Sequence, residues 1–256
     1  MLIDLHTHTT KHSNCSKMTA EELAEAAIGA GLDGIALTEH NSLWDADEID
    51  KLRMKFPQIK IFNAIEVSIE EKEHILVYGV LKPGAFYQNM PLKELEAVVK
   101  AENGIMVLAH PYRYKDEVSN GIFSCGIEGL EVASTNVLAY MIEGMNYIKS
   151  KINPIEVMGS DAHSIDSVGV FATDFKMDIK DELDLVKAIR SKDFTHYKNV
   201  KALNERNENI DKKILIAKNL IEKGLTDSEV KNESGRAVNI SFSYAVRNGK
   251  DVHYIV

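Results

Sequence analysis

The sequence is poor in the residues that build cross-linked or covalently catalytic proteins. It has 2 cysteines, 5 prolines and 1 tryptophan in 256 residues. Two cysteines in a chain of this length exclude a disulfide scaffold. Because Cys15 and Cys125 form no Cys-x-x-Cys pair, we expect any bound metal to have nitrogen and oxygen ligands. The sequence also contains no serine nucleophile elbow and no phosphate-cradling P-loop, which argues against covalent serine catalysis and Walker-type nucleotide use.

Long apolar runs and an excess of positive charge are also missing. No stretch approaches the roughly 20 apolar residues of a spanning helix, and the first residues form a strand-like segment without a basic, apolar leader. The formal net charge is −9. This charge disfavours, without excluding, long-range attraction to nucleic acid, and it disfavours anionic membranes. The sequence therefore predicts a cytoplasmic protein that acts without a membrane.

Metal-ligand residues recur where short apolar segments end or begin. Each segment is rich in Val, Ile and Leu and is bounded by polar residues or glycine, which is typical of strands. Eight such residues occur over the first two thirds of the chain: His6, His8, His40, Glu66, His74, His110, Asp161 and His163. In a barrel of parallel strands, the carboxyl ends of all strands meet at one mouth. The pattern therefore predicts a metal-binding barrel.

Two pairs of these residues have the spacing of a shared ligand site. His6 and His8, and likewise Asp161 and His163, are separated by one residue, so both side chains of a pair point to the same face of a strand. Imidazole and carboxylate ligands together favour zinc, manganese or iron over magnesium or calcium. Eight ligands are too many for a single catalytic ion. We therefore expect two or three divalent ions.

Strand and helix patterns alternate along most of the chain. About seven such units predict an α/β fold, a distorted (β/α)7 TIM-like barrel over residues 1–198. A hairpin of strands 60–69 and 74–80 would bring His74 back to the mouth. Residues 199–256 are more polar and predict a small appendage with a helix at 208–223. The alternation of apolar residues at 238–246 predicts a strand there.

At DLHTH, TEHN, AHP and GSDAH, the chain resembles the polymerase-and-histidinol-phosphatase (PHP) family over residues 2 to about 195. The resemblance implies that His6, His8, Glu66 and Asp161 bind a first ion. It also implies that Glu66 bridges to a second ion held by His74 and His110, and that His40 and His163 bind a third. The family usually supplies one more ligand to the third ion soon after the first motif. The matching stretch KHSNCSKM has no Asp, and three residues compete for this role: His12, Asn14 and Cys15.

The resemblance implies hydrolysis of a phosphate ester by a metal-bridged hydroxide, with Asp161 and His163 in the catalytic centre. Arg113, just after the AHP motif, is a candidate to hold phosphate oxygens, although a surface role fits the sequence equally well. Lys11 and Lys115 are weaker candidates for the same role. We expect a small phosphorylated substrate, such as a phosphomonoester or a nucleotide.

Two other functions fit parts of the pattern. A metal-dependent amidohydrolase or deaminase would use similar ligands on a C–N bond, but such enzymes usually carry a bridging lysine that is not apparent here. A non-enzymatic regulator is the other alternative, because residues 224–250 loosely resemble a helix-turn-helix with Gly235 at the turn. A role of the appendage in packing on the barrel, or in joining subunits of a homo-oligomer, is the simpler interpretation.

Overall fold

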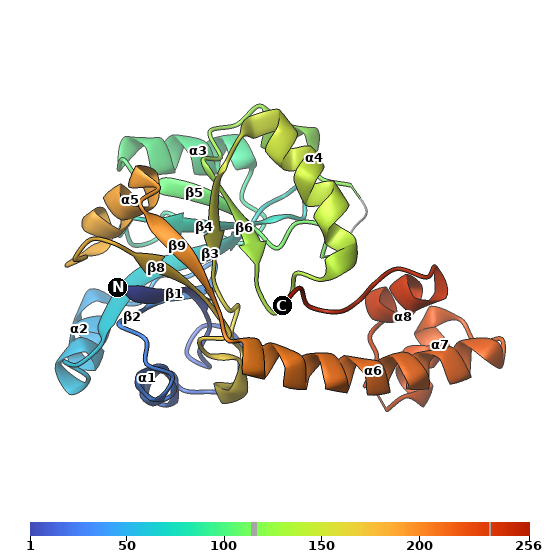
Figure 1. The fold of residues 1–256 in the computed structure, drawn as a ribbon. Helices are drawn as coiled ribbons and strands as arrows, with labels where there is room; N and C mark the ends of the chain where they lie inside the picture. Colours follow the sequence, from blue (N-terminus) through green and yellow to red (C-terminus); the bar gives the residue numbers. More distant parts are fainter. Residues whose placement is uncertain (114–116, 236) are drawn as a thin grey trace.

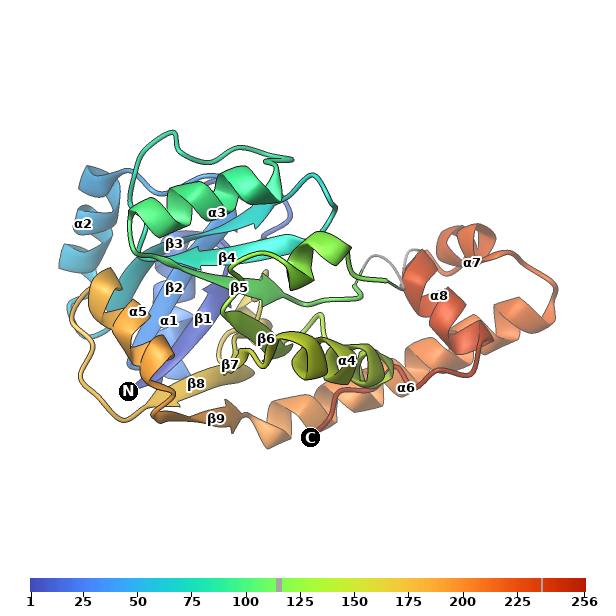
Figure 2. The same ribbon diagram turned by 90° about the horizontal axis from the view of Figure 1, so that it is seen from above.

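The computed structural model describes residues 1–113, 117–235 and 237–256. Its centre is one nine-stranded sheet that curves into a nearly closed barrel (Figures 1 and 2). The strands lie in the order β7-β6-β5-β4-β3-β2-β1-β8-β9. Their bounds are β1 Leu2–Thr7, β2 Gly34–His40, β3 Lys60–Ser68, β4 His74–Tyr78, β5 Ile105–Ala109, β6 Gly129–Ala133, β7 Ile155–Met158, β8 Phe171–Phe175 and β9 Phe194–Lys198.

The helices of the barrel follow its strands, and all but the last pack on the outside of the sheet; the last closes the end opposite the mouth, where it packs against β3, β4 and β7. These helices are α1 Ala20–Gly29, α2 Ala46–Lys55, α3 Leu92–Ala101, α4 Ile142–Ile152 and α5 Glu182–Ser191. The inner strands β1, β2, β3 and β5 are buried along nearly their whole length, as expected for strands with apolar packing on both faces. Helix α1 begins with a capping box formed by Thr19 and Glu22. The predicted α/β barrel is therefore confirmed.

The barrel is distorted because not all of its strands are parallel. Strands β3 and β4 form the predicted antiparallel hairpin, in which Ser68 is paired with His74. Strand β4 is also antiparallel to β5, and β8 is antiparallel to β1 and β9. The reversed direction of β8 and the existence of β9 do not follow from the strand–helix rhythm. The reversal of β4 matters for function, because it places the first residue of this strand at the mouth.

Side chains close the barrel where β7 meets β1 and β8. The Thr173 hydroxyl donates a hydrogen bond to the Met158 carbonyl at 2.9 Å and accepts one from the Met158 amide at 3.0 Å. Just after β7, a Cβ at Gly159 would lie 2.7 Å from both Cβ and the amide nitrogen of His6. Only glycine permits this close approach. The residues after β7 are therefore held directly against the end of β1.

The C-terminal part forms three helices with a small apolar core of their own (Figure 1). They are α6 Val200–Glu222, α7 Asp227–Glu233 and α8 Ile240–Arg247. The predicted strand at 238–246 is wrong, because this segment is α8. Asn239 caps the helix by accepting from the Phe242 amide at 2.7 Å, and burial of Val238, Ala245 and Val246 follows a helical spacing. None of the described helices is long and apolar enough to cross a lipid bilayer.

Candidate metal centre

The eight residues singled out in the sequence lie together at the mouth of the barrel. His6 and His8 come from the end of β1, His40 and Glu66 from β2 and β3, and His74 from the start of β4. His110 follows β5, and Asp161 and His163 follow β7. His6, His8, Glu66, His110 and Asp161 are at most 2 % exposed. Residues spread over more than 150 positions thus form one cluster of imidazole and carboxylate groups.

Hydrogen bonds fix which nitrogen of His6 and His8 faces the centre. His6 Nδ1 donates to Glu131 Oε1 at 2.8 Å. The Ser13 hydroxyl donates to Glu39 at 2.5 Å, so it accepts from His8 Nδ1 at 3.2 Å. Both Nε2 atoms therefore carry a lone pair toward the centre, and they lie 3.0 Å apart. Two lone pairs at this distance repel unless a proton or a metal cation lies between them.

Two carboxylate oxygens complete this arrangement. Asp161 Oδ1 lies 3.3 Å from His6 Nε2 and 3.2 Å from His8 Nε2, and Glu66 Oε2 lies 3.6 and 3.3 Å from the same atoms. Both oxygens are buried, and neither accepts a well-oriented hydrogen bond from the described residues. Tetrahedral ligands at about 2.0–2.1 Å from a zinc ion are roughly 3.3–3.4 Å from one another. The two nitrogens are therefore separated from each other and from both oxygens by distances typical of ligands around one ion.

Glu66 lies between three further imidazoles. Its Oε1 is 2.8 Å from His74 Nδ1 and 2.9 Å from His110 Nε2, while its Oε2 is 2.9 Å from His40 Nδ1. Burial would raise the pKa of Glu66, but the surrounding imidazoles, first His74 and His6, hold it well below its usual range. Glu66 is therefore ionised and is placed to bridge two positive centres.

The charge balance of the cluster favours bound cations. Burial disfavours an imidazolium at His6, yet the Asp161, Glu131 and Glu66 carboxylates raise its pKa well above the usual range. Burial likewise opposes ionisation of Asp161, and the neighbouring His6 and His8 nonetheless lower its pKa. The carboxylates thus stabilise positive charge in a region closed to water. A divalent ion supplies such charge without protonating the ligands.

The backbone around the centre adopts conformations that non-glycine residues rarely take. Positive φ angles occur at Asn41 (57°), His110 (24°), Tyr112 (68°) and Asp161 (52°), all within the segments that follow β2, β5 and β7. Such residues cost about 1–3 kcal/mol each and persist where surrounding contacts impose them. Here the strain turns the His110 and Asp161 side chains toward the centre.

Three buried acids that support the cluster are not apparent as site residues in the sequence. Glu131 in β6 accepts from His6 Nδ1 and from the His110 amide at 3.0 Å. Glu39, in the TEHN motif, accepts hydrogen bonds from Ser13, Thr9 and the Trp44 indole. It therefore holds several segments around the site together, which the sequence alone does not indicate. Asp4 binds Ser160 and the Gly169 amide, and burial raises its pKa to about 6. The sequence feature that could have indicated Glu131 is an acidic residue inside an otherwise apolar strand, GLEVA.

The Glu131→Gln variant should bind metal about 10–100-fold more weakly, which is the usual cost of losing a group that orients a ligand. Glu131 accepts a hydrogen bond on each of its two oxygens, whereas glutamine can accept on only one. Titration of metal-free protein with zinc would measure the loss. Unchanged affinity would show that Glu131 does not orient His6.

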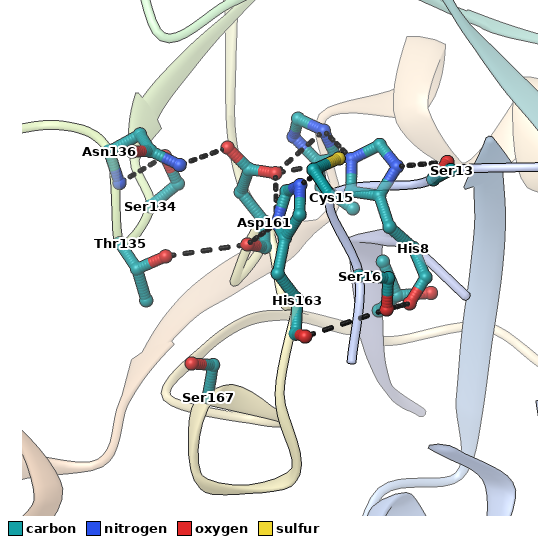
Figure 3. A network of polar contacts seen from close by, with 12 residues as sticks. His8, Ser13, Cys15, Ser16, Ser134, Thr135, Asn136, Asp161, His163 and Ser167 are labelled. Atoms are coloured by element: carbon teal, nitrogen blue, oxygen red, sulfur yellow. Dashed lines mark hydrogen bonds and ion pairs between the residues drawn. The ribbon is translucent and has the colours of Figure 1, made fainter. Parts of the chain in front are cut away.

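A third group of ligands lies on the outer side of the cluster. Ring nitrogens of His8, His40 and His163 lie within 4.8 Å of one another. Burial, together with nearby His8, lowers the pKa of His163 to about 4, so its ring is neutral near pH 7 and suited to bind a metal. Of the three residues that compete to complete this group, Cys15 lies beside it, with Sγ 3.1 Å from His163 Nε2 (Figure 3). Cys15 thus places a sulfur atom beside a group for which the sequence predicts only nitrogen and oxygen ligands.

The candidate phosphate-binding residues lie in different parts of the structure. Arg113 lies at the centre: its Nη1 is 3.3 Å from Asp161 Oδ2 and 3.4 Å from His110 Nε2. Lys11 is instead paired with Glu48 at 2.7 Å, on the outside of the barrel. Lys115 lies outside the described residues. Arg113 is therefore the cation placed to meet a ligand at the metal centre.

A barrel with imidazoles and carboxylates collected at its mouth defines a protein built to bind a cluster of divalent ions. Comparison with known families identifies the family: the PHP domain matches residues 4–119, and the PHP-associated region matches residues 154–194. The chain belongs to the PHP family. No curated protein matches the sequence.

Several solved structures share the fold at low sequence identity. A two-domain protein from Bacteroides vulgatus, described as containing a predicted PHP-like metal-dependent phosphoesterase, has a TM-score of 0.62 and 18 % identity, over 77 % of this chain and 64 % of that chain. PsfC from Pseudomonas syringae has a TM-score of 0.55 and 17 % identity, over 78 % and 92 %. The lesion-specific endonuclease EndoQ from Pyrococcus furiosus has a TM-score of 0.55 and 18 % identity, over 74 % and 56 %. At these identities the likeness concerns the fold.

Proposed function

We propose that this protein is a metal-dependent phosphoesterase that holds two or three divalent ions at the mouth of its barrel. The observation that carries the proposal is the set of four atoms His6 Nε2, His8 Nε2, Glu66 Oε2 and Asp161 Oδ1. Each of the distances between these nitrogens and oxygens lies between 3.0 and 3.6 Å. These separations match those between ligands of one metal ion, and both oxygens are buried without a well-oriented hydrogen bond from the described residues.

The remaining ligands divide among further ions. Glu66 Oε1, His74 and His110 would hold a second ion, and His40 and His163 would hold a third. Mixed imidazole and carboxylate ligands suit zinc, manganese or iron. When bound, such ions activate water as a nucleophile near neutral pH and neutralise charge on a phosphoryl group.

The protein's own residues would bind and orient the phosphate ester. Arg113 would present its guanidinium to the phosphoryl oxygens, where its charge is close to the metal ligands Asp161 and His110. The Asn136 amide donates to Asp161 Oδ2, and the Thr135 hydroxyl donates to the Asp161 carbonyl at 3.4 Å (Figure 3). These bonds keep Asp161 Oδ1 directed at the ions. His163 stays neutral near pH 7 and would act as a ligand.

A cleft of about 510 Å³ leads away from the centre, between the barrel and the C-terminal helices. Arg113 and Asn136 line its inner end, and Lys213 of α6, Lys231 of α7 and Ile240 of α8 line its outer part. Among the described residues that line it, three are cationic and none is acidic. A positive cleft in a chain of net charge −9 favours a substrate that carries phosphate beyond the bond that is cleaved. A nucleotide fits this description.

Charge reversal on α6 tests the role of this cleft. The Lys213→Glu variant should raise KM for a nucleotide substrate about 10-fold, equal to about 1.4 kcal/mol, because one cationic contact becomes repulsive. Hydrolysis of p-nitrophenyl phosphate should change little, since this small ester reaches only the inner end. Lys212→Glu is a matched control, because Lys212 immediately precedes Lys213 and does not line the cleft. Equal KM values for the two variants would remove the cleft from the proposal.

A nucleic acid substrate is a second candidate, supported by the C-terminal helices. Helices α7 and α8 form the predicted helical pair, and Gly235 between them has a φ of 62°. However, Asn239, Ile240, Ser241 and Phe242 at the start of α8 line the cleft, so this end of the helix faces the barrel. The helices would then guide a strand end into the cleft. Absence of retention in a gel-shift assay at moderate salt would remove this candidate.

Steady-state hydrolysis assays test the main proposal against its alternative. Protein loaded with zinc or manganese should release phosphate from p-nitrophenyl phosphate or from a nucleotide such as AMP. A parallel panel of cyclic amides and nucleobases tests C–N hydrolysis. Turnover in the second panel alone would replace the phosphoesterase with an amidohydrolase or deaminase. Lack of turnover in a broad phosphoester panel by fully loaded protein would refute the proposal.

A further inference from the structure

The loop between β1 and α1 is fixed to two separate parts of the metal centre. Within the loop, the Ser13 amide donates to the Thr9 carbonyl at 3.1 Å, and the Ser16 amide donates to the Ser13 carbonyl at 2.9 Å. The Lys17 amide donates to the His163 carbonyl at 2.8 Å, and the Ser16 hydroxyl donates to the His8 carbonyl at 3.0 Å (Figure 3). The loop position is therefore set by His8 on one side and by His163 on the other.

This position places the thiol of Cys15 against a nitrogen lone pair. His163 Nδ1 donates to the Asp161 carbonyl at 3.0 Å, so its Nε2 carries the lone pair. Cys15 Sγ lies 3.1 Å from this Nε2 (Figure 3), and the ring nitrogens of His163, His8 and His40 form one group. A zinc ion with Zn–S of about 2.3 Å and Zn–N of about 2.0–2.1 Å would separate the two ligand atoms by roughly 3.5 Å. The observed distance between Sγ and Nε2 is a few tenths of an ångström shorter than this.

The two competing residues of the same loop lie elsewhere. The His12 ring packs edge-on against Trp44, with 5.9 Å between centroids, and lines a different cleft with Trp44 and Asn63. Asn14 is exposed. The cluster of His8, His40 and His163 supplies the independent indication of an ion, because its ring nitrogens lie within 4.8 Å of one another.

We propose that Cys15 binds a third divalent ion through its sulfur, together with His40 and His163. On binding, the thiol releases its proton to solvent and a metal–sulfur bond forms, so the step involves no oxidant or reductant. Sulfur is a softer ligand than carboxylate and favours zinc over manganese. The third position would therefore prefer a different metal from the two inner positions. This inference rests on the metal-binding part of the proposed function and does not require phosphoesterase activity.

Cobalt substitution tests the sulfur ligand directly. Metal-free protein is loaded with Co²⁺, and the near-ultraviolet absorption is recorded, where a cobalt–thiolate bond gives an intense charge-transfer band. The wild type and the matched control Cys125→Ser should both show the band, because Cys125 lies away from the centre. Cys15→Ser should lose the band and bind its third ion at least 10-fold more weakly. Cys15→Asp should regain the ion without the band.

Thiol protection gives a second readout that is independent of spectroscopy. Zinc should slow the reaction of Cys15 with a thiol reagent at least 10-fold in the Cys125→Ser background, with circular dichroism confirming that each variant is folded. Three bound ions without a thiolate band, or equal reactivity of Cys15 with and without zinc, would overturn the inference. Failure of the protein to bind any zinc would instead overturn the proposed metal centre itself. The two failures are therefore distinguishable.

Discussion

The Glu66→Gln variant should lose its bound ions and nearly all activity. Glu66 faces both proposed inner ion positions: Oε1 lies 2.8 and 2.9 Å from His74 and His110, and Oε2 lies 3.3 and 3.6 Å from His8 and His6. Glutamine keeps the shape but removes the negative charge. We expect the loss of metal affinity to exceed the roughly 10–100-fold cost of losing an outer group. We expect kcat/KM to fall by about 10³-fold or more.

Elemental analysis after dialysis, together with phosphatase assays, would measure both effects. Glu156→Gln is a matched control, because Glu156 pairs with Lys149 at 2.9 Å and its side chain is 40 % exposed. Thermal unfolding adds a third readout. Zinc should raise the melting temperature of the wild type and the control, and it should have little effect on Glu66→Gln. A Glu66→Gln protein that retains both inner ions and most of its activity would contradict the proposed centre.

Replacement of Arg113 should separate catalysis from metal binding. The Arg113 guanidinium is 25 % exposed and lies beside Asp161, where it can meet a phosphoryl group without being a metal ligand. Arg113→Ala should therefore lower kcat/KM by about 10²–10³-fold while the ions remain bound. Arg113→Lys should recover part of the loss, since it restores the charge but not the two-pronged geometry of the guanidinium.

Arg190→Ala provides the control for this series. Arg190 binds Glu128 and the carbonyls of Asn103 and Gly104, away from the centre, so its loss should leave activity per folded molecule unchanged. Metal content measured on the same samples decides the interpretation. If Arg113→Ala lost its ions as well, Arg113 would support the ligands and would not act on the substrate. If it kept full activity, a surface role would be the correct one.

The sequence was most informative where chemistry and strand position coincide. Histidines and acids at the ends of apolar segments could be assigned to one mouth, because the direction of parallel strands determines where their ends meet. The hairpin that returns His74 could be recognised from the short charged turn between its two strands. At these residues, the local sequence pattern and the architecture of the barrel predict the same position for the side chain.

Other parts could not be obtained in this way, for identifiable reasons. Glu131 lies within β6, and the sequence does not show that its side chain faces the buried mouth. The alternation at 238–246 indicated a strand, but capping by Asn239 and burial of Ala245 and Val246 against α6 and α7 select a helix. The choice among His12, Asn14 and Cys15 depends on hydrogen bonds that a loop makes with distant residues. Spacing along the chain does not determine such bonds.

The end of the chain is joined to the support of Asp161. After α8, the backbone returns to the barrel: the Ala139 amide donates to the His253 carbonyl at 2.9 Å, and the Tyr140 amide donates to the Asp251 carbonyl at 2.9 Å. The Tyr254 hydroxyl then donates to the Thr135 carbonyl at 2.9 Å, next to the Asn136 that holds Asp161. A shortened chain that stopped before Tyr254 would leave this carbonyl unpaired and slacken the segment behind a metal ligand. The last residues thus support the segment that positions Asp161. We expect their removal, for crystallisation or fusion, to disturb the position of this carboxylate.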